Sequence, residues 1–191
     1  MSGQIIATGR SAAGMPTGKL AVWMVIASEI PIFGGILASY LMHRIGHPDW
    51  AQMTAGLNVW IGTFNTALLV TSSLFAMLAH AAAERGNGPL AAARLRLAAY
   101  GGLVFLCIKA YEWYTKISHD HVPQTGTFYG YYFSATGLHA IHILAGVAIL
   151  LAIAAQAEKG KHLGRVELIG IYWHFVDVVW FFLFHIFYII R

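Results

Sequence analysis

The chain has 191 residues, of which 58% are hydrophobic and only 10% are charged. A mean hydropathy of +0.63 excludes an ordinary soluble domain and indicates an integral membrane protein. The formal net charge of +4 does not indicate a nucleic-acid partner, because the basic loops lack the aromatic residues that such a surface carries.

Five apolar runs are each long enough to cross a membrane as a helix, which requires about 20 residues. They cover residues 20–42, 57–82, 95–117, 128–156 and 168–190. The connecting segments are short, so we predict an all-α, polytopic membrane fold in which residues 19–191 form one domain of five transmembrane helices. Residues 1–18 form a polar segment before this domain, and the first run is too long for the core of a cleaved signal peptide.

Lys and Arg are distributed unevenly between the two sides of the predicted bundle. One side carries Arg10, Lys19, Arg85, Arg94, Arg96, Lys159, Lys161 and Arg165, and the other carries Arg44, Lys116 and Arg191. Because cytoplasmic loops are enriched in Lys and Arg, we predict a cytoplasmic amino terminus and a periplasmic carboxyl terminus. The basic side favours phospholipid headgroups. Arg85, Arg94 and Arg96 are the candidate contacts, although they also suit an ordinary positive-inside loop.

Three of the predicted helices bring acidic and imidazole groups to a similar depth. At about 1.5 Å per residue, Glu29 on the first span and Asp177 on the last lie near the middle of the membrane. His139 and His142 on the fourth span reach the same layer, and His174 lies one turn from Asp177. An acidic group at this depth costs about 2.5 to 3.5 kcal/mol. We therefore expect these groups to face the bundle and to hydrogen-bond to one another.

Such a layer suits a metal or haem site, a proton path, or a polar core that fixes helix packing and lipids. His139 with His142, and His174 with Asp177, have the spacing of half-sites of a metal centre. The Glu-x-x-His pattern of di-iron bundles is absent, and large aromatic residues on the last span leave little room for haem. We favour the structural polar core, with no catalytic residue and no metal ligand in this chain, and keep Glu29 as a candidate for proton exchange.

The third span carries a second polar pair and the single cysteine of the chain. Lys109 and Glu112 are three residues apart, so we expect them to pair along the helix. Cys107 lies in the same span. One cysteine excludes an intrachain disulfide and a thiolate metal site built from this chain alone.

Five short motifs carry a resemblance to a known family. They are residues 27–30 (ASEI), 64–69 (FNTALL), 109–114 (KAYEWY), 133–142 (FSATGLHAIH) and 172–180 (YWHFVDVVW). In this order they resemble subunit III of the haem-copper terminal oxidases, in the short five-helix bacterial form of cytochrome c or quinol oxidase subunit III. The match runs from about residue 19 to the end.

The resemblance implies a non-catalytic subunit of a respiratory oxidase in a bacterial inner membrane, acting in aerobic electron transport. It implies that the chain packs against the catalytic subunit I, beside subunit II and other oxidase subunits, holds phospholipids between helix bundles, and supports proton uptake. Haem and copper are then expected in the partner subunit and no cofactor in this chain. Glu29 matches the family's membrane-buried Glu, and His139, His174 and Asp177 match its other buried polar positions.

The chain also departs from the family pattern. Many members have seven spans, and the first span here corresponds to their third. Residues 30–33 (IPIF) replace the more usual Val-Met-Phe-Phe. Two alternatives stay open. Residues 116–118 and the polar loop after them are similar to small relatives associated with nitric-oxide reductases. An independent membrane haem or metal redox protein would use His139, His142, His174 and His185 as ligands.

Overall fold

The computed structural model describes residues 16–190 of the chain. Its long helices are α1 (Thr17–Ile45), α3 (Val59–Glu84), α4 (Gly88–Ile117), α5 (Thr127–Glu158) and α6 (Gly164–Phe184). Each is long and apolar enough to cross a membrane, and a further turn prolongs α6 to Ile189. The predicted all-α fold with five candidate spans is thereby confirmed. Arg10 and Arg191, which entered the charge comparison, lie outside the described residues.

The helices begin where polar residues cap them. The Asn58 side chain accepts hydrogen bonds from the backbone N–H groups of Trp60 and Ile61 and so starts α3. Asn87 accepts from the backbone N–H of Leu90, 3.1 Å away, and Pro89 occupies the first turn of α4. Such caps satisfy donors that the helix itself leaves unpaired. Helix α4 therefore starts well before the apolar run at residue 95 that predicted it.

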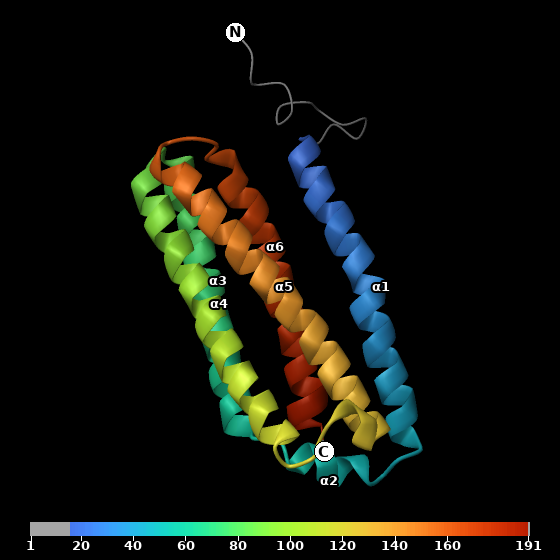
Figure 1. The fold of residues 1–191 in the computed structure, drawn as a ribbon. Coiled ribbons are helices and arrows are strands. Elements are labelled where there is room, and N and C mark those ends of the chain that lie inside the picture. The colour runs from blue at the N-terminus through green and yellow to red at the C-terminus, as the bar shows by residue number, and fades with distance from the viewer. Residues whose placement is uncertain (1–15, 191) are drawn as a thin grey trace.

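Three short helical segments accompany the spans. They are α2 (Trp50–Ala55), a 3₁₀ turn (Pro123–Thr125) and a π-helical turn, η2 (His185–Ile189). The sequence did not predict the first two, and the third is a π-helical turn inside the predicted span 168–190. Trp50 is buried and stacks on Tyr40 of α1, with ring centroids 5.3 Å apart. The α2 helix lies at the same end of the bundle as η2 (Figure 1), where Tyr40 also packs against Phe187 of η2.

Helix α1 is the least enclosed of the five long helices. In Figure 1, α3 and α4 stand along one edge and α1 along the other, with α5 and α6 between them. Only 11% of the residues in the most apolar part of α1 are buried, against 33–44% in the other four. Most of the α1 surface is therefore free to contact lipid or other subunits.

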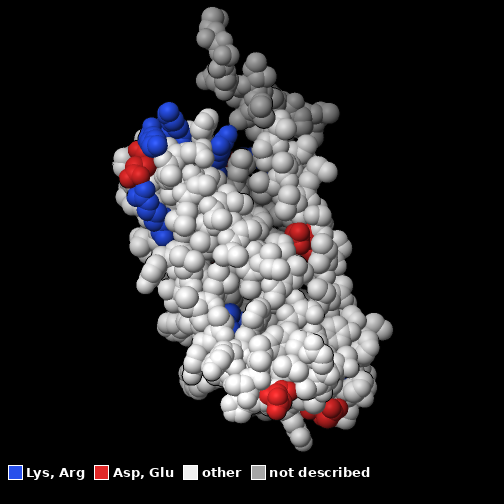
Figure 2. Space-filling view, viewed as in Figure 1, with Lys and Arg blue, Asp and Glu red and all other residues white. Residues whose placement is uncertain are grey.

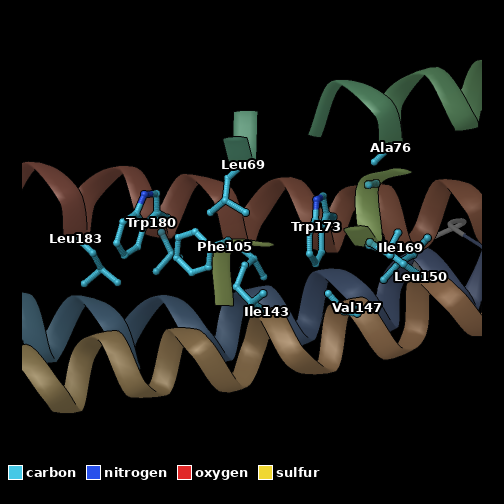
Figure 3. Close-up of a cluster of buried hydrophobic side chains, with 14 of the residues drawn as sticks. Leu69, Ala76, Phe105, Ile143, Val147, Leu150, Ile169, Trp173, Trp180 and Leu183 are labelled. Atoms are coloured by element: carbon cyan, nitrogen blue, oxygen red, sulfur yellow. The ribbon is translucent and has the colours of Figure 1, made fainter. Parts of the chain in front are cut away.

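Two tryptophans of α6 fill the centre of the bundle, as Figure 3 shows. The Trp173 indole N–H donates to the Ser72 hydroxyl of α3 at 3.0 Å, and the Trp180 indole N–H donates to the Thr66 hydroxyl at 3.0 Å. Gly102 of α4 and Gly146 of α5 flank Trp173 so closely that a Cβ on either would lie 2.6 Å from its ring. These two indoles position α6 and, with it, the polar groups predicted to be functional.

Most of the Lys and Arg residues in the described chain lie at one end of the bundle. Figure 2 shows Lys and Arg gathered at the end that carries the α3–α4 and α5–α6 connections. Arg85, Lys159, Lys161 and Arg165 belong to these connections and the helix ends beside them. This arrangement agrees with the charge pattern that suggested the orientation.

Candidate functional site within the helix bundle

Glu29 and His142 join α1 to α5. Glu29 Oε2 lies 3.2 Å from His142 Nε2, and both side chains are largely buried. The geometry between these two atoms does not meet that of a hydrogen bond. His142 Nδ1 lies 2.8 Å from the carbonyl oxygen of Leu138. A carbonyl only accepts, so Nδ1 carries a proton. For Nε2 to hydrogen-bond to the carboxyl group, the pair must then hold one further proton, on the imidazole or on the carboxyl.

His174 and Asp177 separate, although they lie one turn apart on α6. His174 is exposed, and its Nδ1 lies 2.5 Å from the Ser73 hydroxyl of α3. Asp177 is buried beside Ser73, but neither carboxylate oxygen has a hydrogen-bond partner among the described residues. The expected hydrogen bond between Asp177 and an imidazole is therefore wrong. Residues three apart differ by about 60° around a helix, and here His174 turns toward α3.

His139 does not join the predicted network either. It is fully buried, and neither ring nitrogen has a hydrogen-bond partner in the described part of the chain. Its ring stacks on Trp180 with centroids 5.4 Å apart and meets the edge of Phe105 at 5.7 Å. Aromatic rings from α6 and α4 surround His139 where the sequence predicted polar partners. The imidazole is therefore held by ring contacts and not by hydrogen bonds to the described residues.

Lys109 and Glu112 form the most complete polar cluster in the described bundle. Lys109 Nζ lies 3.1 Å from Glu112 Oε2, and it also donates to the hydroxyls of Tyr132 at 3.1 Å and Tyr188 at 2.8 Å. Both tyrosines donate in turn to Glu112 Oε1. An ammonium group has three donors and no acceptor, so every Nζ hydrogen has a partner. Sequence spacing found the ion pair but not the two tyrosines, which come from α5 and η2.

The three candidate lipid-binding arginines differ in their availability. Arg96 is engaged by Glu158 of α5 through two contacts, the shorter of them 2.5 Å. Arg94 donates to the carbonyl oxygen of Leu78 at 2.6 Å. Arg85 ends α3 and is exposed, so it has the side chain most free to meet a headgroup.

Comparison with known proteins decides the family. A family model described as Cytochrome c oxidase subunit III matches residues 8–191. The chain belongs to the cytochrome c oxidase subunit III family. It is 32% identical over 173 residues to cytochrome c oxidase subunit 3 of Corynebacterium diphtheriae. The aligned region covers 87% of this chain and 84% of that protein.

Two further relatives show how widely this subunit is shared. A probable quinol oxidase subunit 3 of Staphylococcus haemolyticus is 29% identical over 181 residues, covering 90% of this chain and 88% of that protein. The heme-copper oxidase subunit I+III of Aeropyrum pernix is 28% identical over 183 residues, covering 90% of this chain but 22% of that protein. The relatives thus include both cytochrome c and quinol oxidases, so membership in the subunit III family does not fix the electron donor.

Family and fold together define what this subunit III is. It is a multi-pass membrane protein and an accessory, non-catalytic subunit of a haem-copper oxidase. Within residues 16–190, no three or more His, Cys, Asp or Glu side chains are arranged to hold a metal ion.

Proposed function

We propose that this subunit III packs against the catalytic subunit I in a bacterial inner membrane, stabilises it together with bound phospholipid, and supports proton uptake. The family match over residues 8–191 carries this proposal. The Aeropyrum relative adds support, because its name places subunits I and III in one chain. The two parts of such a fusion must lie in the same membrane.

The contact between α1 and α5 supports the proton-binding part of the proposal. Glu29 and His142 lie within ion-pair distance, and Glu29 is close to the midpoint of α1 (Thr17–Ile45). The added proton that their hydrogen bonding requires can reside on either group. With the added proton the pair leaves no isolated charge in the bundle, whereas without it a carboxylate faces a neutral imidazole, so burial favours proton binding by this pair.

A cavity of about 330 Å³ between α1, α5 and α6 supports lipid binding. Its walls include Val22, Val25, Ile149, Ile153 and Leu168, and Arg165 also lines it. Apolar walls suit an acyl chain, and a guanidinium group suits a phosphate. Arg85, Arg94 and Arg96 remain the proposed headgroup contacts near the α3–α4 connection, with Arg96 the least available because of Glu158.

The test compares the oxidase purified with this chain to the same oxidase purified from cells that lack it. We expect equal haem content per subunit I and a similar initial rate of oxygen consumption. We also expect less bound phospholipid phosphorus and a faster decline of activity during turnover when the chain is missing. Equal lipid content and equal durability of activity in the two preparations would contradict the proposed function.

A further inference from the structure

A cavity of about 520 Å³ lies where α2, the end of α4 and the start of α5 meet. We call it the α2–α4 cavity. Because α4 runs from Gly88, beside the α3–α4 connection, to Ile117, the cavity lies at the end of the bundle away from the basic connections (Figure 1). Met53 and Gly56 form part of its wall, and its polar lining residues are Gln52, Thr115, Lys116, His119, His121 and Tyr129.

The Lys116 ammonium group has spare hydrogen-bond donors in this cavity. Its Nζ donates to the carbonyl oxygen of Gly56 at 2.7 Å, and it makes no other hydrogen bond within residues 16–190. An ammonium group has three donors, so two remain. Lys109 on the same helix uses all three. Lys116 is only partly exposed, and its two remaining donors point to an acceptor from outside the chain.

The chain folds back over the end of α4 and brings His121 to the same cavity. Asp120 has a φ of 57°, in the left-handed region, and the backbone N–H of His121 donates to the carbonyl oxygen of Lys116 at 3.1 Å. A left-handed residue followed by such a hydrogen bond is a common way to end a helix. The loop conformation therefore holds His121 beside Lys116.

Two further polar groups in the cavity lack partners in the protein. The His121 ring tilts against Tyr129, with ring centroids 4.8 Å apart. His121 Nδ1 is buried and has no hydrogen-bond partner in the described part of the chain. Tyr129 is 8% exposed, and its hydroxyl likewise makes no hydrogen bond to a described residue. Buried polar groups are usually paired, so these two groups also indicate a bound acceptor.

The charge around the cavity favours an anion. No Asp or Glu lines it, and Asp120 is exposed outside the lining. Glu112 attracts Lys116 electrostatically, but its carboxylate oxygens are already engaged by Lys109 and by two tyrosines. Two imidazoles in the lining suit a metal ion, but the Lys116 ammonium opposes a cation, and no carboxylate in the lining offsets that repulsion.

We propose that the α2–α4 cavity binds a phosphate group through the Lys116 ammonium, the Tyr129 hydroxyl and the His121 imidazole. Donors from three segments suit the several oxygens of a phosphate better than the two oxygens of a carboxylate. The phosphate group belongs either to free inorganic phosphate or to a phospholipid headgroup. The site goes beyond the proposed function, because it lies at the other end of the bundle from the arginines assigned to headgroups and does not depend on subunit I.

The first arm of the test measures binding of radiolabelled inorganic phosphate to the full-length chain in lipid-free detergent, by equilibrium dialysis. Tyr129→Phe removes the hydroxyl and keeps the ring against His121. Tyr114→Phe is the matched control, because Tyr114 is 71% exposed on α4 and does not line the cavity. If the ligand is free phosphate, we expect Tyr129→Phe to weaken binding about tenfold, the effect of one hydrogen bond to a charged group. Tyr114→Phe should bind like the unsubstituted chain.

A second pair of variants tests the charge. Lys116→Met removes the ammonium group, and Lys161→Met removes an exposed lysine at the opposite end of the bundle. We expect Lys116→Met to abolish saturable phosphate binding and Lys161→Met to leave it unchanged. Circular dichroism checks the helical content of all variants. If Lys116→Met does not fold, Tyr129→Phe decides alone, because its hydroxyl has no partner among the described residues.

The second arm replaces free phosphate with phosphatidylglycerol and counts retained lipid molecules by native mass spectrometry. If the phosphate group belongs to a lipid, Tyr129→Phe and Lys116→Met retain fewer lipid molecules than their controls, and free phosphate does not bind saturably. If every variant matches its control in both arms, the proposal is wrong. Both arms use this chain alone, so that result would leave the proposed function intact.

Discussion

At the scale of single residues, the Lys109 cluster shows how a charged pair persists inside this bundle. Lys109 is 2% exposed and Glu112 is 4% exposed. Removing two charges from water costs several kcal/mol per ion, which their attraction offsets only when the remaining hydrogen bonds are made. Tyr132 and Tyr188 make those bonds to both charges. The cluster also ties η2 to α4 and α5 through Tyr188.

Replacing one member of this cluster tests whether the pair depends on its partners. We expect Lys109→Met to destabilise the chain by about 3 kcal/mol, because Glu112 is left as a buried charge that only the tyrosines contact. The double variant Lys109→Met with Glu112→Leu should recover much of this loss, since the two tyrosine hydroxyls, 3.3 Å apart, can pair with each other. Thermal unfolding in detergent, followed by circular dichroism, measures both. A double variant no more stable than the single one would contradict this explanation.

Single residues also mark the limit of what the sequence predicts. Spacing along one helix was enough to pair Lys109 with Glu112, because both lie on α4. Depth alone placed His139 and Asp177 in one layer and predicted hydrogen bonds that neither makes within the described part of the chain. Depth does not specify the direction in which a side chain leaves its helix, and that direction depends on how α6 packs against α3 and α4.

At the scale of elements, α6 is positioned by close approach around Trp173. Gly102→Ala or Gly146→Ala would bring a methyl group against the indole ring. Overpacking costs about 1 to 3 kcal/mol, more than the 0.5 to 1 kcal/mol that alanine contributes inside a helix relative to glycine. We therefore expect both variants to lower the unfolding temperature in detergent.

Gly34→Ala is the matched control, because nothing lies within 4 Å of its Cβ position. It should leave the unfolding temperature unchanged or raise it. Unchanged stability in Gly102→Ala and Gly146→Ala would show that α6 can move away from α4 and α5, contrary to the packing described.

The elements themselves were predictable to different degrees. Hydropathy predicted the five long helices, because a membrane span needs a long apolar run whatever it packs against. It missed α2, which is too short to be distinguished by hydropathy, and it did not distinguish the π-helical turn η2 from the rest of the run 168–190. Their formation depends on tertiary contacts such as the stacking of Trp50 on Tyr40 and the packing of Phe187 on Tyr40.

At the scale of the whole molecule, the charge distribution predicts how the bundle sits in the membrane. Glu84, at the basic end, and Ser118, at the opposite end, are both exposed. With Cys107 replaced by serine, we expect Ser118→Cys to react with a membrane-impermeant maleimide from the periplasmic side. Glu84→Cys should react only after the membrane is permeabilised. The reverse pattern would contradict a cytoplasmic amino terminus.

The central claim is that this subunit III acts within a haem-copper oxidase and holds no redox centre itself. The most direct measurement is a mild-detergent purification through a tag on this chain, with subunit identification, a visible spectrum and metal analysis of the complex and of the separated chain. We expect haem and copper to purify with a large partner subunit, and the separated chain to be colourless and free of metal. Haem or metal retained by the separated chain would contradict this account and make the buried histidines ligands.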